Sequence, residues 1–559
     1  MLAMWRIPTI LACLAVRIAH AIELDVDSAD SIKQAASTVA YDMVSFYQGN
    51  QSGQIPGLLP VPQPPDKGYY WWEAGAMFGA LVNYWYYTGD TTYNAITTQA
   101  ILFQVGEDSD FKPQNQTKSL GNDDQAFWAM TAMSAAEFRF PDPPVGGPSW
   151  LGLAQAVFNE QTAVWDTKYC NGGLRWQIPF SNPGYNLKNS ISNGCLFNLA
   201  ARLSRYTKDP SYAVWGDKVW DWMWRIGLIS PTYQVFDNSE ADKLNCTELD
   251  KNQWSYNAGV MLLGAGVMYN FTGDQKWQDR TERLLQTLSG NFFVNGVMRE
   301  GCENPVGTQI GCNQDQKSFK AYLSRWLTVT SIMVPSTAAN ITALLRTSAK
   351  AAAAQCTGGP RGTECGIQWD KGGKWDGTTG VGQSMSALEV MLGSMIGLPQ
   401  ETGQRPKPPV TGDTGGTSIS IPTAGNPIPP TPVVPATKKD RAGAWFITVL
   451  IALIALFMCY FMWTEAFEHS ASTIGGVAAR NKGKGRVEER EKGGPERVII
   501  DLATGKRRSL GVMSEKGETG APVGSGGLPI VEEVMPTEPK MVKGDRASLP
   551  RWRGGDWVT

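Results

Sequence analysis

The stretch NFTGDQKW, residues 270–277, decides the predicted fold because variants of it recur along the chain. Two further copies read YYTGDTTY (86–93) and RYTKDPSY (205–212), and FRFPDPPVGGPSW (138–150) is a degenerate copy. Each copy ends one apolar-periodic segment and begins another, because Gly or Lys-Asp stops a helix and Asp or Thr can cap the next. The full copies begin 119 and 65 residues apart, and the longer interval is about twice the shorter. A period of roughly sixty residues predicts stacked helical hairpins.

Apolar side chains repeat with the 3.6-residue helical period in twelve segments, and no long segment alternates as a strand does. Twelve helices arranged as six hairpins predict an all-α domain, an (α/α)6 toroid. The expected helices span approximately residues 30–47, 70–87, 91–103, 122–139, 148–164, 189–206, 210–226, 253–270, 275–293, 316–334, 336–354 and 381–396.

The even-numbered helices begin with polar and aromatic clusters, whereas the odd-numbered helices begin without such clusters. If the even helices form an inner ring, their N-termini converge on one mouth. Helix N-termini carry partial positive charge, and concave sites with a few polar groups bind small ligands. We therefore expect a site there for a polar, uncharged ligand such as a glycan. The clusters read YYWWEAGA, GNDDQAFW, NSISNGC, QWSYNAG, DQKSFK and VGQSMSAL.

Composition divides the chain into five parts. Residues 1–21 hold an apolar run and a small-x-small cleavage site, as in a signal peptide. Residues 22–400 are globular in composition, and residues 401–441 form a Pro/Gly/Thr-rich linker that reads as a disordered stalk. Residues 442–464 are long and apolar enough for a transmembrane helix, and residues 465–559 read as a disordered cytosolic tail.

Charge and histidine content exclude several classes of function. The net charge of −2 gives no global field for nucleic acid. The chain has 2 histidines, His20 and His469, and both lie outside residues 22–400. Ser-His-Asp and Cys-His catalysis and histidine metal sites are therefore excluded in the globular part. Carboxylates must carry any proton transfer there, and neither a metal nor a cofactor is expected.

The cysteines and glycosylation sequons suit an oxidising compartment. Seven cysteines remain outside the signal peptide and the span, so at least one stays unpaired within the chain. Close spacing predicts Cys302–Cys312 and Cys356–Cys365, and we expect Cys170–Cys195 as a third pair. Glycosylation sequons begin at Asn50, Asn115, Asn245, Asn270 and Asn340.

Two adjacent carboxylates, Asp123 and Asp124, stand at the start of the expected fourth helix, with Asn122 as its expected cap. Their carboxyl groups can approach within about 5–6 Å, a separation typical of retaining glycosidases. The helix N-terminus favours one ionised carboxylate, whose charge raises the pKa of the other. Acidic residues also favour helix starts without any catalytic role.

Four long motifs carry a family resemblance: GNDDQAFWAMTAMSAAE, LRWQIPF…GYNLKNSISNG, QWSYNAGVMLLGAGVMYNFTGD and CNQDQKSFKAYLSRW. Over roughly residues 30–397 the chain resembles the fungal mannan endo-1,6-α-mannosidases of glycoside hydrolase family 76, of the yeast cell-wall type that acts on GPI-linked glycans. The resemblance implies an (α/α)6 fold and a retaining mechanism with Asp123 as nucleophile and Asp124 as general acid/base. The implied substrate is α-1,6-mannan or a GPI-core glycan. Hydrolysis and transfer to a cell-wall glucan acceptor both remain open.

Further side chains at the mouth are candidate substrate contacts. Aromatic residues there can stack on sugar rings or fill the core, and polar residues can bind hydroxyls or cap helices. Arg175 and Lys320 can meet a phosphate on a GPI glycan or form ordinary ion pairs. The candidate substrate-binding residues are Trp72, Trp128, Trp176, Asn193, Tyr256, Asn257, Asp315 and Lys320.

The signal and the span predict a single-pass protein of the plasma membrane or an endomembrane, with a lumenal or extracellular catalytic domain. This attachment departs from the GPI anchor of the yeast family members. Two other functions remain open from the sequence: a noncatalytic, membrane-anchored glycan-binding or cell-wall sensor protein, and a structural scaffold.

Overall fold

The computed structural model describes residues 22–60, 68–303, 311–398, 409–425 and 442–460, together with two short strands near residue 500. The expected signal peptide lies outside the described residues, as does nearly all of the expected tail. The chain divides into two compact units, Met1–Asp440 and Arg441–Thr559.

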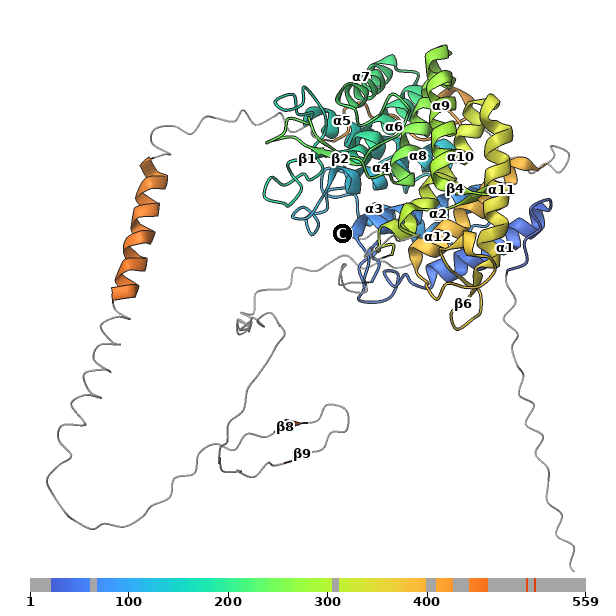
Figure 1. The fold of residues 1–559 in the computed structure, drawn as a ribbon, viewed down its shortest axis with the longest axis horizontal. Coiled ribbons are helices and arrows are strands. Elements are labelled where there is room, and N and C mark those ends of the chain that lie inside the picture. The colour runs from blue at the N-terminus through green and yellow to red at the C-terminus, as the bar shows by residue number, and fades with distance from the viewer. Residues whose placement is uncertain are drawn as a thin grey trace, which may run out of the picture. The chain divides into compact units, whose positions relative to one another are not determined.

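The first unit is mostly helical, and each of the twelve predicted helices is present (Figure 1). Their ends differ from the predicted ones by at most three residues. The helices are α1 (Ala29–Val44), α2 (Trp71–Thr88), α3 (Asn94–Phe103), α4 (Asn122–Phe138), α5 (Trp150–Ala163), α6 (Ser190–Thr207), α7 (Pro210–Ile226), α8 (Ser255–Thr272), α9 (Gln275–Phe292), α10 (Phe319–Met333), α11 (Ala338–Ala354) and α12 (Val381–Gly393). Short 3₁₀ helices are η1 (Gly301–Glu303), η2 (Gln316–Ser318), η3 (Pro335–Thr337), η4 (Trp369–Lys371), η5 (Ser394–Gly397) and η7 (Gly412–Thr414).

The even-numbered helices form a closed ring. Each packs against the next from α2 to α12, and α12 packs back against α2. The odd-numbered helices pack on the outside of this ring, with α1 against α12, α5 against α4 and α9 against α8. Figure 1 shows α7, α9 and α11 at the periphery of the helical body. Residues in the first turns of α2, α4, α6, α8 and α10 line one pocket, and Gly382 of α12 lies against Ser318 at the start of α10. The N-termini of the inner helices therefore gather at one end of the ring.

Glycines let neighbouring inner helices approach closely. A Cβ added at Gly75 of α2 would lie 2.7 Å from the Trp128 ring of α4. A Cβ at Gly259 of α8 would lie 2.8 Å from the Trp326 ring of α10. A large aromatic side chain on one helix thus fills the space left by the missing side chain on its neighbour, and interiors packed this tightly tolerate little added volume.

Short strands, which the sequence analysis did not predict, add one wall near the mouth of the ring. Strand β1 (Leu187–Asn189) pairs antiparallel with β2 (Asn238–Glu240), and β2 pairs with β3 (Leu249–Asp250). Asn189 and Asn238 lie opposite each other in this register. The other strands are β4 (Phe293–Val294), β5 (Val297–Met298), β6 (Cys356–Gly358), β7 (Glu364–Cys365), β8 (Ile499–Ile500) and β9 (Arg507–Arg508), which form three two-stranded pairs.

The structure contains the two disulfides expected from close spacing, Cys302–Cys312 and Cys356–Cys365. The expected Cys170–Cys195 pair is wrong. Cys170 bonds to Cys246, and Cys195 is a buried free cysteine. Cys195 lies within α6, where its side chain faces the packed interior, whereas Cys170 and Cys246 lie in adjacent loops. The asparagines of all five sequons are exposed.

Part of the expected stalk lies on the helical domain, contrary to the prediction that it is extended and disordered. We call residues 409–425 the strap. Val410 N donates to the Glu137 carbonyl of α4 at 2.8 Å, and Ile421 N donates to Gln155 Oε1 of α5 at 2.6 Å. Further along α5, Asn159 Nδ2 donates to the carbonyls of Pro422 and Ala424, both at 2.9 Å. The helices satisfy the backbone groups of the strap, so this Pro/Gly-rich segment is ordered without a core of its own.

In the second unit, the helix Ala442–Tyr460 is long and apolar enough to cross a membrane, and none of it is buried. It covers most of the predicted 442–464 span, whose last four residues lie outside the described part. Within the expected tail, β8 and β9 pair with each other.

A buried polar cluster joins three inner helices where the ring closes. Glu389 of α12 accepts hydrogen bonds from Arg325 of α10 at 2.6 Å and from Asn83 of α2 at 2.9 Å. Arg325 and Glu389 are 8% and 2% exposed, so water cannot compensate for the loss of either charge.

Replacing Arg325 with Met should lower the free energy of unfolding by about 3–5 kcal/mol, because it leaves the Glu389 carboxylate buried without its cation. Denaturant unfolding at pH 7 measures this. The double variant Arg325→Met/Glu389→Gln should regain much of the loss, since the introduced glutamine is neutral and still accepts from Asn83. A single variant within about 1 kcal/mol of the wild type would contradict the assignment.

Replacing Asn159 with Ala should raise the rate at which a nonspecific protease cuts the strap by about tenfold, because two hydrogen bonds to it are lost. Timed digestion followed by mass spectrometry measures the rate. Asn291→Ala, at an exposed asparagine of α9, is the matched control. Equal cleavage rates in both variants would show that the strap is not held by α5.

Candidate active site

The acidic pair lies in the first turn of α4, at the mouth end of the inner ring. Gly121 is the N-cap residue, and Asp124 Oδ2 accepts a hydrogen bond from Gly121 N at 2.7 Å. Asp123 Oδ1 accepts from Asp124 N at 3.0 Å, and Asp123 Oδ2 accepts from Asn189 Nδ2 at 3.0 Å. Both carboxyl groups therefore use donors at the helix start while they line the same pocket.

The expectation that Asn122 caps α4 is wrong. Asn122 is the first helical residue, and its side-chain amide donates to the Arg175 carbonyl at 2.9 Å. Its backbone N–H donates to the Trp176 carbonyl at 2.8 Å. Asn122 thus fixes the loop that carries Trp176 against the start of α4. Gly121 therefore takes the N-cap position.

The backbone at Gly121 has φ −93° and ψ 159°, which any residue can adopt. A Cβ at that position would nevertheless lie 2.3 Å from Asp123 Oδ1 and 3.1 Å from Asp124 Oδ2. These two oxygens thus lie no farther apart than about 5.4 Å, the sum of the two distances. This upper limit is compatible with the carboxyl separation of about 5–5.5 Å in retaining glycosidases.

The two aspartates have different electrostatic environments. Burial raises the pKa of Asp123 to about 6, and the hydrogen bonds from Asn189 and Asp124 N oppose a larger rise. Burial, and then the negative charge of Asp123, hold the pKa of Asp124 well above its ordinary value. The unequal shifts favour the state in which the pair shares one negative charge, held on Asp123, and one proton, held on Asp124.

The pocket around the pair has an aromatic and a polar side. Of the predicted contacts, Trp72, Trp176, Tyr256 and Asp315 line it. Asn189, Asp237 and Asn238 also line the pocket and were not predicted. Asn189 could have been found from its place as an Asn at the very start of the predicted helix 189–206, where an N-cap is expected. The complete lining is Trp72, Asp123, Asp124, Phe127, Trp176, Leu187, Asn189, Ile191, Asp237, Asn238, Tyr256, Asp315 and Phe319.

Stacked rings support the aromatic side. Tyr256 stacks on Phe319 with ring centroids 3.8 Å apart and planes at 7°. The Trp72 ring centroid lies 4.7 Å from that of Phe127. Next to them, burial and the charge of Asp123 raise the pKa of Asp315 to about 7. Asp315 lines the pocket, and its buried Oδ1 has no hydrogen-bond partner in the protein.

Three predicted contacts do not line the pocket and are part of the protein interior. Trp128 is fully buried among other aromatic rings. Asn193 is buried and exchanges hydrogen bonds with the Leu174 backbone. Asn257 is buried and donates to Asp237 Oδ1 at 3.0 Å, so it acts behind the pocket wall. The inner helices are covered on all sides, so a position near an N-terminus does not by itself point a side chain into the mouth.

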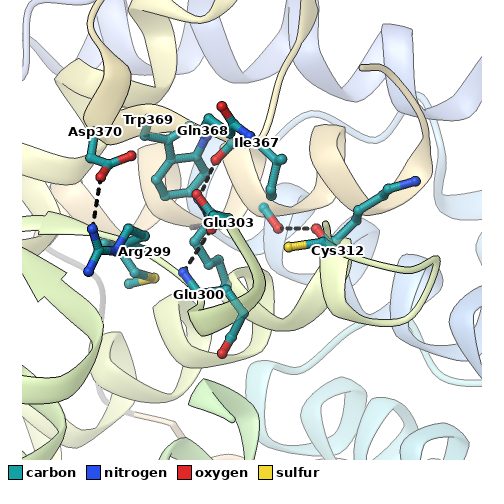
Figure 2. A network of polar contacts seen from close by, with 12 residues as sticks. Arg299, Glu300, Glu303, Cys312, Ile367, Gln368, Trp369 and Asp370 are labelled. Carbon is teal, nitrogen blue, oxygen red and sulfur yellow. Dashed lines mark hydrogen bonds and ion pairs between the residues drawn. The ribbon is translucent and has the colours of Figure 1, made fainter. Parts of the chain in front are cut away.

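Lys320 also lies away from the pocket. Its ammonium group is 2.8 Å from Glu303 Oε1, donates to the Ile367 carbonyl, and sits 3.7 Å from the centre of the Trp369 ring. Figure 2 shows this surrounding network, with Glu300 and Glu303 below Trp369 and Arg299 paired with Asp370.

Arg175, the other basic residue expected to meet a phosphate, is paired with Asp166 at 3.0 Å and Asp242 at 2.7 Å. In the part of the chain that the structure describes, no lysine, arginine or histidine lines the pocket. Among the same residues, no group of three or more His, Cys, Asp or Glu side chains is arranged to hold a metal ion.

A carboxylate beside a protonated carboxyl group, in a pocket with aromatic walls, can attack a sugar carbon and protonate the departing oxygen. Fold and site together define a glycoside hydrolase. The sequence pattern of Glycosyl hydrolase family 76 matches residues 31–405, and the chain belongs to this family. The family predicted from the sequence is thus confirmed.

Two curated relatives support the same family assignment. The chain is 44% identical over 445 residues to mannan endo-1,6-alpha-mannosidase DCW1 of Saccharomyces cerevisiae, covering 78% of this chain and 94% of the relative. It is 41% identical to mannan endo-1,6-alpha-mannosidase DFG5 of the same yeast, covering 77% of this chain and 92% of the relative.

Solved structures have the same fold. The crystal structure of Dfg5 from Chaetomium thermophilum in complex with glucosamine is 47% identical, with a TM-score of 0.67 over 72% of this chain and 97% of that one. An α-1,6-mannanase of Salegentibacter sp. is 16% identical, with a TM-score of 0.52 over 65% of this chain and 98% of that one, and this likeness supports the fold alone.

Replacing Gly121 with Ala should lower kcat/KM at least about 100-fold while lowering the melting temperature by only a few degrees, about the effect of a lost helix cap. The added methyl group displaces both carboxyl groups but strains no backbone angle. Activity assays and thermal unfolding measure the two effects. Gly290→Ala, in α9 where a Cβ meets nothing within 4 Å, is the control and should keep full activity. Full activity in Gly121→Ala would contradict the geometry.

Proposed function

We propose that this protein is a retaining endo-α-1,6-mannosidase that acts on α-1,6-mannan or GPI-linked mannose glycans in fungal cell-wall biogenesis. The observation that carries the proposal is the adjacent Asp123–Asp124 pair, whose two carboxyl groups line one pocket and have different hydrogen-bond donors. The larger upward pKa shift of Asp124 supports it. The names of the curated relatives support the α-1,6-mannosidic linkage. The ring of helices is proposed to be a complete (α/α)6 toroid of six hairpins, with the pocket at its mouth.

Each aspartate has one role in the proposed mechanism. Asp124 protonates the glycosidic oxygen of the leaving sugar while Asp123 attacks C1, which gives a covalent mannosyl-enzyme with inverted configuration. Asp124, now a carboxylate, then takes a proton from the incoming hydroxyl group, which attacks C1 and releases Asp123. The second inversion restores the original anomeric configuration.

The incoming hydroxyl group decides the product. Water gives hydrolysis, whereas a sugar hydroxyl gives transfer, with a cell-wall glucan as the proposed acceptor. Trp72, Trp176 and Tyr256 are proposed to stack on sugar rings, and the unpartnered oxygen of Asp315 to accept from a sugar hydroxyl. Because no basic residue lines the described pocket, we do not expect it to bind a phosphate on the glycan.

We propose that the domain is exposed to the lumen or the cell exterior. Residues 1–21 act as the signal peptide, and residues 442–464 act as the single membrane span. Residues 401–441, which include the strap, form the linker, and residues 465–559 form the cytosolic tail. The exposed sequon asparagines suit glycosylation in the secretory pathway.

Incubation with α-1,6-mannooligosaccharides tests the function, with NMR reading the anomeric configuration of the first product. The wild type should release α-configured product, and added glucan should reveal transfer. Asp123→Ala should lose at least about 10⁴-fold in kcat/KM on every substrate. Asp124→Ala should lose much less on aryl mannosides, whose leaving groups need no protonation. A β-configured first product, or full activity in Asp123→Ala, would overturn the proposal.

A further inference from the structure

Asn189 stands where the small sheet meets the inner ring. It is the last residue of β1 and the N-cap of α6, and it lies opposite Asn238 in the β1–β2 pair. Its backbone carbonyl oxygen accepts a hydrogen bond from Asn193 Nδ2 at 2.8 Å, and its side chain lines the pocket. The backbone of Asn189 is therefore fixed by a strand on one side and a helix on the other.

The two ends of the Asn189 side chain have different partners. Its Oδ1 accepts from Ser192 N at 3.1 Å, which is the capping bond of α6, and its Nδ2 donates to Asp123 Oδ2 at 3.0 Å. An asparagine amide has one accepting and one donating end. Because the cap requires the accepting end, the donating end must face Asp123. The start of one inner helix thereby orients an acid on the next.

Backbone N–H groups at the start of α4 also donate to Asp123, but the titratable groups around it all carry negative charge when they ionise. They come from each element around it: Asp124 on its own helix, Cys195 on α6, Tyr256 on α8 and Asp315 before α10. None of them can supply a positive charge. A neutral donor that is fixed in place is then an important means of stabilising the Asp123 carboxylate.

We propose that Asn189 is a positioning residue for the reaction, which holds the Asp123 carboxylate in its attacking orientation and stabilises its negative charge. The inference rests on the proposed function, because it assigns Asn189 to the residue proposed as nucleophile. Capping of α6 and positioning of Asp123 are separable, since they use opposite ends of one side chain.

The variant Asn189→Ser separates the capping of α6 from the positioning of Asp123. Serine is as good an N-cap as asparagine, but its side chain is too short to reach Asp123. Losing a donor to the ionised form raises the pKa of Asp123, and the acidic limb of the pH profile reports the group that must be ionised. For the full-length protein in detergent micelles, the acidic limb of kcat/KM on an α-1,6-mannooligosaccharide should move up by about one pH unit. Activity below that limb should fall about tenfold, mainly in kcat.

Two further variants complete the test. Asn189→Ala loses both bonds, so it should show the same shift together with a lower melting temperature. Asp274→Ser exchanges the N-cap residue of α9, away from the pocket, and should keep the wild-type pH profile. If Asn189→Ser has a wild-type acidic limb while Asn189→Ala is impaired, Asn189 only caps α6 and the inference is overturned. If the wild type itself cleaves no α-1,6-mannoside, the proposed function fails instead.

Discussion

The close contact between inner helices is the constraint on which the rest of the structure depends. Six helices close into a ring only if each approaches both neighbours, and glycines such as Gly75 and Gly259 make room for Trp128 and Trp326. Closure brings six helix N-termini to one end, where partial positive charges and unsatisfied N–H groups gather. A pocket that needs an ionised carboxylate is best placed there. The active site is thus a consequence of how the ring closes.

The site itself balances opposing effects. Burial raises the pKa of both acids. It also strengthens the hydrogen bonds and charge interactions that differ between Asp123 and Asp124. Asp123 accepts a hydrogen bond from the side-chain amide of Asn189, whereas Asp124 accepts one from the backbone N–H of Gly121 at the start of its own helix. The difference between two chemically identical side chains comes from this unequal supply of donors. The bare Cα of Gly121 leaves the space in which both can sit.

The helices and the acidic pair were predictable because their signals are local. Periodicity and turn residues define helices within a few residues, and two adjacent aspartates at a helix start need no tertiary information. Trp128 and Lys320 were misplaced because helices buried on every face give no sequence cue to direction. Asn189 and Asp237 depend on strands of two or three residues, paired across about fifty positions, which have no period to detect. The Cys170–Cys246 bond, 76 residues apart, is equally nonlocal.

The strap makes most of its contacts through backbone groups, such as the carbonyls of Pro409, Pro422 and Ala424, while the helices supply the side chains. The helices α5 and α6 therefore supply most of the side chains in the docking contact, α4 adds a backbone carbonyl, and Ser418 and Ser420 add two side chains from the strap itself. The strap is nevertheless not interchangeable with any other segment, because a Cβ at Gly416 would lie 2.1 Å from the Tyr206 hydroxyl and one at Gly425 would lie 3.0 Å from the Ala156 carbonyl. Elsewhere in the strap, a residue that keeps the backbone path can replace another without losing the attachment.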